Sequence, residues 1–423
     1  MRRNARSTVL TTLIASGALA LTACGGGSSF DEEPTGDATS GGDSGDPGAP
    51  LTVLIGSSGD AETDAVTAAV AAWSEESGVE ARAQAASDLN QELAQGFAAG
   101  NPPDIFYTST DLIAGYVAAG SLYPYGDQLT NVDDVYPALI DTFTIDDQLY
   151  CAPTNFSTLA LVINTDSWAA AGLTDADIPT DWESLAAAAQ ALTTDQQVGL
   201  SFGPEYQRIG AFMAEAGGAI IGEDGTTAVV DSPENLEALT FVKEMLANDT
   251  LKYPSEIGAG WGGEAFGSGG AAMTVEGNWI NGALQNDFPD ISYEVVEMPE
   301  GSAGKGTMLY TNCWGIAQDS QNKEGAVSLV EHLTSKDVQV ALLEAYGVMP
   351  SVQSARDDFF EVYPEQGAFL EGGEYGVGLP TVQGANDVIA DFNGQLEGLE
   401  TTDPQTILSS VQTNMQALLD SQG

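Results

Sequence analysis

From Leu51 onward, the chain alternates short apolar runs with longer stretches of helical periodicity, and this alternation restricts the folds open to it. The run "LTVLIG" at residues 51–56 is typical of a buried strand, and the segment after it has an apolar helical stripe that ends at Gly78. Apolar runs at residues 102–109 and 159–164 alternate with helical segments in the same way. Strands that alternate with helices predict an α/β fold with mostly parallel sheets.

The first 50 residues differ from the rest of the chain. A basic start, "MRRNAR", is followed by a mostly apolar run that closes with small residues, so residues 1–23 are predicted to be a signal peptide. The tetrapeptide Leu21-Thr22-Ala23-Cys24 resembles the bacterial lipobox, in which the cysteine carries the lipid anchor. An ordinary signal peptide with an incidental cysteine is the alternative. Residues 24–50 contain little to bury and predict a lipidated, flexible, acidic linker.

The chain is strongly acidic, with 62 Asp and Glu against 11 Lys and Arg and a formal net charge of −51. Such a chain repels nucleic acid and anionic lipid, so neither is expected as a partner. The charge excess by itself indicates a solvated surface, and adaptation to salt stays open. Residues 51–423 are long enough for two lobes and contain no further run apolar enough to cross a membrane.

Three cysteines limit the chemistry available to the chain. With Cys24 assigned to lipid, Cys151 and Cys313 remain, and a leftover pair in an exported protein predicts a disulfide. Two separate buried thiols are the alternative. The single histidine, His332, and one pair of cysteines are too few for a zinc site or a Cys/His catalytic site. We therefore expect no metal, no cofactor and no catalytic residue.

Several sequence blocks follow the order found in one known family. They include a Pro-Asp strand block, a crossover block that ends in "AGL", a Pro-x-x-Trp helix start, and a Phe-x-x-Gly-x-Ala-Met strand that ends at Gly-x-Trp. In these blocks the chain resembles the extracellular solute-binding proteins of ABC importers, in the sugar-binding group that includes the maltodextrin-binding proteins. The resemblance extends over residues 51 to about 420, and its blocks lie at residues 101–125, 149–173, 179–192, 266–280, 298–307 and 345–351.

The resemblance implies a two-lobe periplasmic-binding-protein fold, type II-like, with a hinged cleft between the lobes. The disulfide of Cys151 and Cys313 would then lie at the pivot, where it could brace the hinge without preventing closure. The expected N-terminal lobe contains residues 51–152 and 316–347, the C-terminal lobe contains residues 156–311 and 351–423, and the hinge lies near residues 152–156, 311–315 and 347–351.

A sugar offers flat C–H faces and many hydroxyl groups, so its site needs aromatic platforms together with carboxylate, amide and Arg partners. In open α/β sheets such groups lie at strand ends that face the cleft. Trp73, Trp168 and Trp182 are expected in the core, whereas Trp279 matches the family's ligand-stacking position. The predicted ligand-binding residues are Ser58, Asp60, Glu62, Ser109, Thr110, Asp111, Asn155, Glu205, Tyr206, Arg208, Trp261, Glu276, Asn278, Trp279, Asn312, Trp314, Tyr346 and Tyr375.

The expected function is therefore that of a substrate-binding lipoprotein of an ABC importer. It would capture a carbohydrate, most simply an oligosaccharide, and deliver it to the transmembrane permease subunits. We expect a monomer that is extracytoplasmic and lipid-anchored to the outer face of the cell membrane. A Gram-positive surface and a periplasm both stay open.

Three alternatives stay open from the sequence. The same fold could bind a non-sugar solute, such as a polyamine, an iron complex or an anion, or it could present ligand to a receptor without transport. A secreted glycoside hydrolase would need two carboxylates at a defined separation, and 62 acidic residues supply such pairs by chance. No nucleophile elbow, P-loop or His-Glu-x-x-His motif is present, which favours a binding protein over an enzyme.

Overall fold

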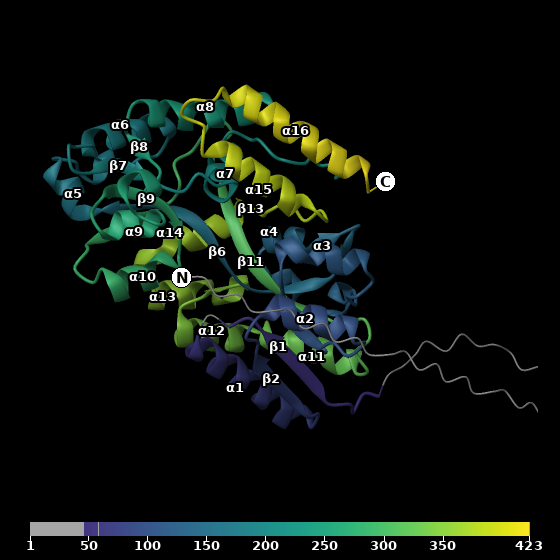
Figure 1. Ribbon diagram of the computed structural model, residues 1–423. Helices are drawn as coiled ribbons and strands as arrows, with labels where there is room; N and C mark the ends of the chain where they lie inside the picture. Colours follow the sequence, from purple (N-terminus) through teal and green to yellow (C-terminus); the bar gives the residue numbers. More distant parts are fainter. Residues whose placement is uncertain (1–45, 58, 423) are drawn as a thin grey trace, which may run out of the picture. The chain divides into compact units, whose positions relative to one another are not determined.

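Two long antiparallel strands, β6 (Cys151–Asn164) and β11 (Thr307–Ile316), form the centre of the main sheet (Figure 1). The structure is a computed structural model and describes residues 46–57 and 59–422. The predicted signal peptide, Cys24, most of the linker and Ser58 lie outside the described residues. Among the described strands, the main sheet has the order β2-β1-β3-β11-β6-β9-β7-β8.

On one side of this central pair, three strands are joined in parallel to one another, and helices from two distant parts of the chain cover them. The green helices α11 and α12 lie beside the purple β1 and α1 in Figure 1, and their apolar residues share one core. The elements of this part are β1 (Leu51–Ile55), α1 (Asp60–Ser77), β2 (Ala81–Ala85), α2 (Leu89–Ala98), β3 (Ile105–Ser109), α3 (Thr110–Ala118), α11 (Lys323–Leu333) and α12 (Lys336–Tyr346).

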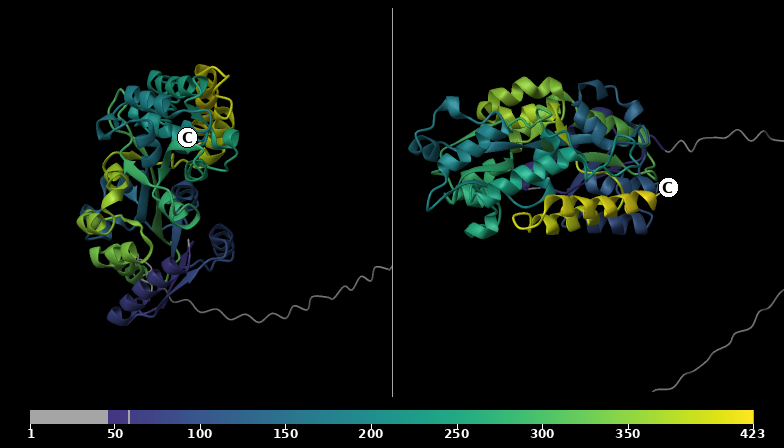
Figure 2. Two further views of the ribbon diagram at one scale, coloured as in Figure 1. Left: turned by 90° about the vertical axis from the view of Figure 1, so that its left-hand side faces the viewer. Right: turned by 90° about the horizontal axis from the view of Figure 1, so that it is seen from above.

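On the other side, β7 is parallel to both β8 and β9, and a second and larger core forms around these strands. The last two helices lie side by side, and α16 also contacts α8 (Figure 1 and Figure 2). The elements are α5 (Thr165–Ala170), α6 (Trp182–Leu192), β7 (Val198–Ser201), α7 (Tyr206–Glu215), α8 (Pro233–Ala247), β8 (Leu251–Lys252), α9 (Gly262–Gly267), β9 (Ala271–Gly277), α10 (Ile280–Asp287), β10 (Tyr293–Val296), α15 (Ala385–Leu396) and α16 (Pro404–Asp420).

A third core joins residues around Tyr136 to the segment that follows Tyr346. It packs Phe156 of β6 against Phe369 and Met349, so it covers the central strands directly. Its elements and the remaining small strands are α4 (Pro137–Phe143), β4 (Thr144–Ile145), β5 (Gln148–Leu149), β12 (Met349–Pro350), α13 (Arg356–Val362), α14 (Gly367–Glu371) and β13 (Gly376–Val377).

The predicted α/β fold is confirmed, with one difference in the sheet. Each outer part is parallel, as predicted, but β6 pairs antiparallel with β9, β10, β11 and β12, and β11 pairs antiparallel with β3. The chain crosses from one part to the other along β6 and returns along β11, and this reversal makes the centre antiparallel. No helix in the described residues is long and apolar enough to span a membrane.

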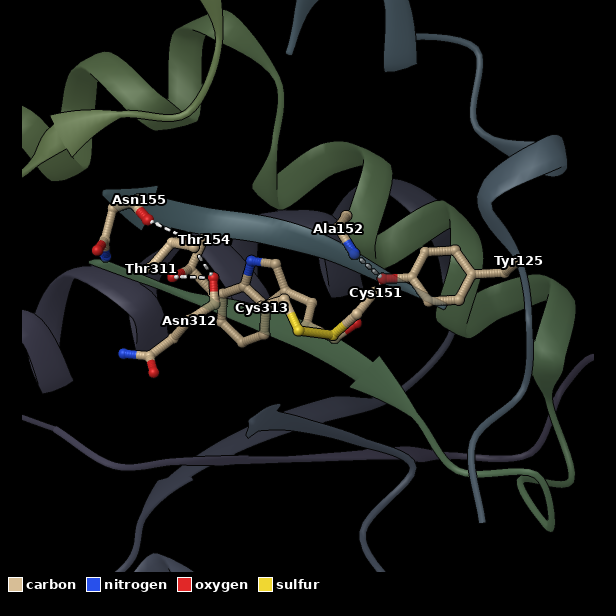
Figure 3. The surroundings of a disulfide bond; sticks show 9 residues. Tyr125, Cys151, Ala152, Thr154, Asn155, Thr311, Asn312 and Cys313 are labelled. Carbon is tan, nitrogen blue, oxygen red and sulfur yellow. Dashed lines mark hydrogen bonds between the residues drawn. A yellow bond between two sulfur atoms is a disulfide. The ribbon is translucent and has the colours of Figure 1, made fainter. Parts of the chain in front are cut away.

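The predicted disulfide between Cys151 and Cys313 is present and joins β6 to β11 (Figure 3). Both cysteines are fully buried in a small apolar cluster with Phe106 and Leu122. The two cysteines are 162 residues apart, so in the entropic account the bond stabilises the fold by about 5 kcal/mol.

The hydroxyl of Tyr125 holds the same two strands together beside the disulfide. It accepts a hydrogen bond from the backbone N–H of Ala152 at 2.7 Å (Figure 3). It also donates to the carbonyl of Trp314, which is the register partner of Ala152. The register of β6 and β11 shifts between Asn312 and Cys313. The phenol thus satisfies two buried backbone groups next to this irregularity.

Gln339 of α12 connects the segment that follows β12 to strand β6. Its amide donates to the carbonyl of Thr154 at 3.0 Å and accepts from the backbone N–H of Ser351 at 2.9 Å. The hydroxyl of Ser351 donates to the carbonyl of Pro153 at 3.0 Å. Strands β6 and β11 and the segment that follows β12 are therefore linked by side-chain hydrogen bonds and one covalent bond.

The far end of α7 is fixed by a buried carboxyl group. Glu215 is fully buried, and its Oε2 accepts a hydrogen bond from Trp182 Nε1 at 2.5 Å. Its Oε1 has no hydrogen-bond partner in the described part of the chain. Burial raises the pKa of Glu215 well above its ordinary value, and the Trp182 hydrogen bond opposes only part of that rise.

Tyr125→Phe should weaken the fold selectively. The change removes only the hydroxyl and leaves the Ala152 N–H and Trp314 carbonyl buried without a partner. We expect a loss of about 1–3 kcal/mol in the free energy of unfolding, measured in urea. Tyr150→Phe is the matched control, because that hydroxyl bonds an exposed Gln148 side chain. Equal stability of both variants would contradict the role of Tyr125.

Glu215→Gln should change how stability depends on pH. The folded protein binds the Glu215 proton more tightly than the unfolded chain, so this group stabilises the fold at acid pH. That contribution is lost as the pH rises from about 4.5, the ordinary pKa, through the raised pKa of the folded state. A neutral amide keeps the bond to Trp182 without this loss.

The variant and the wild type should therefore differ little near pH 4, and the variant should become the more stable as pH rises to 8. Urea unfolding at a series of pH values measures this, and each unit by which the pKa is raised corresponds to about 1.4 kcal/mol. Exposed Glu183→Gln, on neighbouring α6, is the control. A constant difference at all pH values would exclude a raised pKa at Glu215.

Candidate functional site

The carboxyl ends of β7, β8 and β9 meet at one edge of the sheet and surround a small cavity. Because these strands are parallel, the residues that follow them lie close together. The cavity has a volume of about 90 Å³. Its walls come from the segments after β7 and β8, the start of α9 and the end of β9, and consist of Gly203, Pro204, Glu205, Arg208, Pro254, Ser255, Gly260, Trp261, Gly262 and Glu276.

An ion pair lies in the wall of this cavity. Arg208 Nη2 is 2.7 Å from Glu276 Oε2, and the side chains are 16% and 1% exposed. Burial raises the pKa of Glu276, and the charge of Arg208 opposes that rise. Burial alone would lower the pKa of Arg208, but the charge and hydrogen bond of Glu276, together with Tyr310 and Glu205, outweigh burial, so this pKa is raised. Pairing thus offsets part of the cost of burying both groups.

Trp279 adjoins this ion pair at the end of β9. Its Nε1 donates to Glu276 Oε2 at 3.0 Å, and Arg208 Cζ lies 5.4 Å from the indole centroid. The ring of Tyr310 meets the indole edge to face, with centroids 5.2 Å apart and planes at 85°. Trp279 nevertheless remains 39% exposed, which is unusual for so large an apolar side chain. It is an aromatic surface that is open to a ligand.

Two glycines make this arrangement possible. A Cβ at position 277 would lie 2.2 Å from the indole of Trp279, and a Cβ at position 262 would lie 2.6 Å from Glu276 Oε1 and from Thr274 Oγ1. Only glycine allows the backbone to approach these side chains so closely.

A row of polar residues continues from Trp279 across the central strands. Ser109 of β3 pairs with Asn312 of β11, which pairs with Asn155 of β6. Ser157 lies two residues beyond Asn155, about 7 Å along the same face of the strand. Its Oγ accepts a hydrogen bond from the backbone N–H of Asn278 at 3.1 Å. Figure 3 shows Asn155 and Asn312 on their neighbouring strands beside the disulfide.

Another polar group lies near the carboxyl end of β3. Tyr107 donates to Glu62 Oε1, on the first turn of α1, at 3.2 Å. The pKa of Tyr107 is raised by burial and, to a smaller extent, by the neighbouring Tyr346 and Glu62. This group joins residues from β3, α1 and α12.

The structure thus brings most of the predicted ligand-binding residues into connected groups. Six lie at or beside the ion pair and Trp279, and five lie along the polar row or with Tyr107. The first set is Glu205, Arg208, Trp261, Glu276, Asn278 and Trp279, and the second is Glu62, Ser109, Asn155, Asn312 and Tyr346.

Several other predicted residues lie elsewhere. Trp314 is 0% exposed and packs on Tyr107 with ring centroids 4.5 Å apart, so no ligand can stack on it in this structure. Tyr375 bonds Glu297 at 2.7 Å, and Lys305 lies over its ring. Both side chains are used in packing.

The remaining predicted residues vary in their position. Tyr206 is buried against Phe392, and it lines a separate cavity of about 450 Å³ formed by residues 376–382, the 219–221 segment and α4. Asp60 is exposed at the start of α1, and Thr110 is buried. Asp111 belongs to α3, and Ser58 lies outside the described residues.

The sequence analysis missed Tyr107, Ser157 and Tyr310. Each lies within a strand, where an aromatic or small residue is easily taken for core. A signal was present, because Ser157 and Tyr310 are two residues from Asn155 and Asn312 and so share their strand faces.

Comparisons with known proteins identify the family. The sequence model of the family described as "Bacterial extracellular solute-binding protein" matches residues 68–368. A binding protein of Brucella abortus (strain 2308) is 25% identical over 295 residues, which are 66% of this chain and 70% of that protein.

Three solved structures show the same fold. The cyclic α-maltosyl-1,6-maltose binding protein of Arthrobacter globiformis has a TM-score of 0.80 and 21% identity, over 88% of this chain and 99% of its own. A cyclo/maltodextrin-binding protein complexed with maltotetraose gives 0.78 and 19%, over 88% and 97%. The sugar-binding protein of the phytopathogen Xanthomonas citri gives 0.77 and 16%, over 88% and 98%. The chain has the two-lobe fold of these proteins and belongs to the bacterial extracellular solute-binding protein family.

Proposed function

We propose that this protein is the substrate-binding component of an ABC importer and captures an oligosaccharide at the cavity beside Trp279. One observation carries the proposal: an open indole face lies next to a buried, ion-paired carboxylate. A sugar ring presents C–H groups that pack on such a face and hydroxyl groups that bond to polar side chains. The amides of Asn155 and Asn312 add donors and acceptors along the same sheet face.

Solved structures of similar proteins support carbohydrate as the ligand class. Two of the solved structures above are described by maltose-derived or maltodextrin ligands, and the receptor of Streptomyces glaucescens, with a TM-score of 0.72, is described with acarbose. Their identity to this chain is 19–21%, so they do not identify the sugar.

We propose that the ligand is bound between two lobes that close on it. The lobes would be residues 51–152 with 316–347, and residues 156–311 with 351–423. The separate cores around β1 and around β7 support this division. The crossings near residues 152–156, 311–315 and 347–351 carry the disulfide, Tyr125 and Gln339 contacts. Ligand would then shift the open–closed equilibrium by its higher affinity for the closed state.

Delivery and attachment complete the proposal. A lipid on Cys24 would hold the protein at the outer face of the cell membrane, and residues 24–50 would let a monomer reach the permease subunits. The ligand would be transferred unchanged, since the family is one of binding proteins. Recovery of intact sugar after prolonged incubation tests that the protein is not a hydrolase.

A polyamine is the second candidate ligand, and one observation favours it. A cavity of about 530 Å³ shares Pro204, Glu205 and Ser255 with the first, and four carboxylates line it, from Glu205, Glu256, Glu397 and Glu400. Such a lining suits a cation. The ion pair and the open indole face favour an uncharged ring, and a ligand panel separates the two.

Thermal unfolding of the protein with maltodextrins, cyclodextrins, xylo- and cello-oligosaccharides, monosaccharides and spermidine tests the proposal. A ligand at 100 times its Kd should stabilise the folded state by about 2.7 kcal/mol and raise the unfolding midpoint. A rise with one class of oligosaccharide, recovered unchanged, is the expected result. A rise with spermidine alone would overturn the sugar assignment and keep the fold.

Gly262→Ala should abolish that rise while the protein stays folded. Its new Cβ would lie 2.6 Å from both the Glu276 carboxylate and the Thr274 hydroxyl, so it would displace Glu276, which lines the cavity. Gly282→Ala is the control, because a Cβ on this glycine of α10 would meet nothing within 4 Å. Normal ligand binding by Gly262→Ala would place the ligand elsewhere.

A further inference from the structure

Three contacts together fix the orientation of Trp279. Glu276 Oε2 accepts hydrogen bonds from both Arg208 Nη2 and Trp279 Nε1, at 2.7 and 3.0 Å. The Arg208 guanidinium also lies over the indole, 5.4 Å from its centroid. Tyr310 packs edge to face on the same ring. The indole is therefore held through its N–H group and by contacts to its ring.

These contacts come from elements far apart in the sequence. Arg208 belongs to the first turn of α7, Glu276 to β9 and Tyr310 to β11. The hydroxyl of Tyr310 donates to the backbone carbonyl of Gln207, the neighbour of Arg208, so the two contacts on the indole are themselves joined. The platform, meaning the Trp279 indole with Arg208, Glu276 and Tyr310, is thus held by helix α7 and strands β9 and β11. A surface that is held in place before binding lowers the ordering cost when a ligand binds.

We propose that Arg208 and Glu276 are positioning residues, which act on the ligand through Trp279 by holding its indole with one face open. This inference rests on the proposed function for its ligand, but the orientation of the indole can be tested without one. Arg208 is paired with Glu276 and its Cζ lies over the ring, so both interactions are made inside the protein. The remaining exposure of Trp279 is where a sugar face packs.

Arginine is required at this position for a physical reason. Its flat guanidinium can bond a carboxylate in its plane and stack on an aromatic ring with its face, whereas the compact ammonium of lysine cannot do both at once. Arg208→Lys keeps the positive charge beside the buried Glu276. It removes the planar contact with the indole, so the variant separates orientation from charge.

The first measurement needs no ligand. The near-ultraviolet circular dichroism and acrylamide quenching of the wild type, minus those of Trp279→Leu, give the signal of this one indole. The same difference is measured between Arg208→Lys and its double variant with Trp279→Leu. We expect a weaker dichroic signal and faster quenching for Trp279 when residue 208 is lysine, because the indole is then less constrained.

The second measurement is a double-mutant cycle with maltotetraose as the probe, using calorimetry and, for weak complexes, NMR titration. Arg208→Lys should lower the affinity on the order of tenfold when Trp279 is present. In the Trp279→Leu background the same change should alter affinity less than twofold. Arg356→Lys is the matched control, because Arg356 also pairs with a carboxylate, Glu371, and lies over a ring, Phe360.

The outcomes separate this proposal from the proposed function. An equal loss of affinity in both backgrounds would overturn positioning and show that Arg208 contacts the ligand itself, for example through its buried Nε, which has no hydrogen-bond partner among the described residues. An unchanged Trp279 signal in Arg208→Lys would overturn it as well. If the wild type does not bind maltotetraose but the signal changes as expected, positioning holds and this sugar is excluded as the ligand.

Discussion

The pairing of β6 with β11 is the interaction on which the rest of the structure depends. Both strands pass between the two outer parts of the sheet, and each carries residues of the candidate site on the same face. The register of the two strands shifts between Asn312 and Cys313, and next to this shift the Tyr125 hydroxyl and the disulfide hold the strands together. The candidate-site residues Asn155 and Asn312 therefore lie next to the part of the backbone that the disulfide and Tyr125 hold together.

The burial of the Glu276 carboxylate explains why this side chain is surrounded by hydrogen-bond donors. A carboxylate that is 1% exposed would be costly alone, and it is tolerated because Arg208 and Trp279 both donate to it. The buried Glu276 carboxylate, near the carboxyl end of β9, needs a cationic partner. Arg208 supplies it from the first turn of α7. The opposite end of the same helix carries Glu215, which has no cationic partner among the described residues and whose burial favours its neutral form. Two buried carboxyl groups on or beside one helix thus meet different electrostatic conditions.

Much of the fold could be predicted from the sequence, because strands and helices alternate and site residues follow the carboxyl ends of strands. Glu205, Glu276 and Trp279 were found in this way. The partners were not, because the Arg208–Glu276 bond joins positions 68 residues apart and no local pattern encodes it. The burial of Trp314 was also missed, because the contact of its ring with Tyr107 depends on strand register, although its neighbour Cys313 was predicted to lie at a crossing.

The position of the candidate site on the crossing strands bears on how ligand binding could be coupled to movement. Groups contributed by β6, β9 and β11 are held together by backbone pairing, so Trp279 and the row near Asn155 keep nearly one geometry. Glu62 and Tyr107 belong to α1 and β3, in the other proposed lobe. A ligand that contacts both sets gains its full affinity only when they come together. Under the proposed two-lobe closure, the surface at Trp279 and Asn155 acts as the reference, and the group at Glu62 and Tyr107 approaches it as the closed state forms.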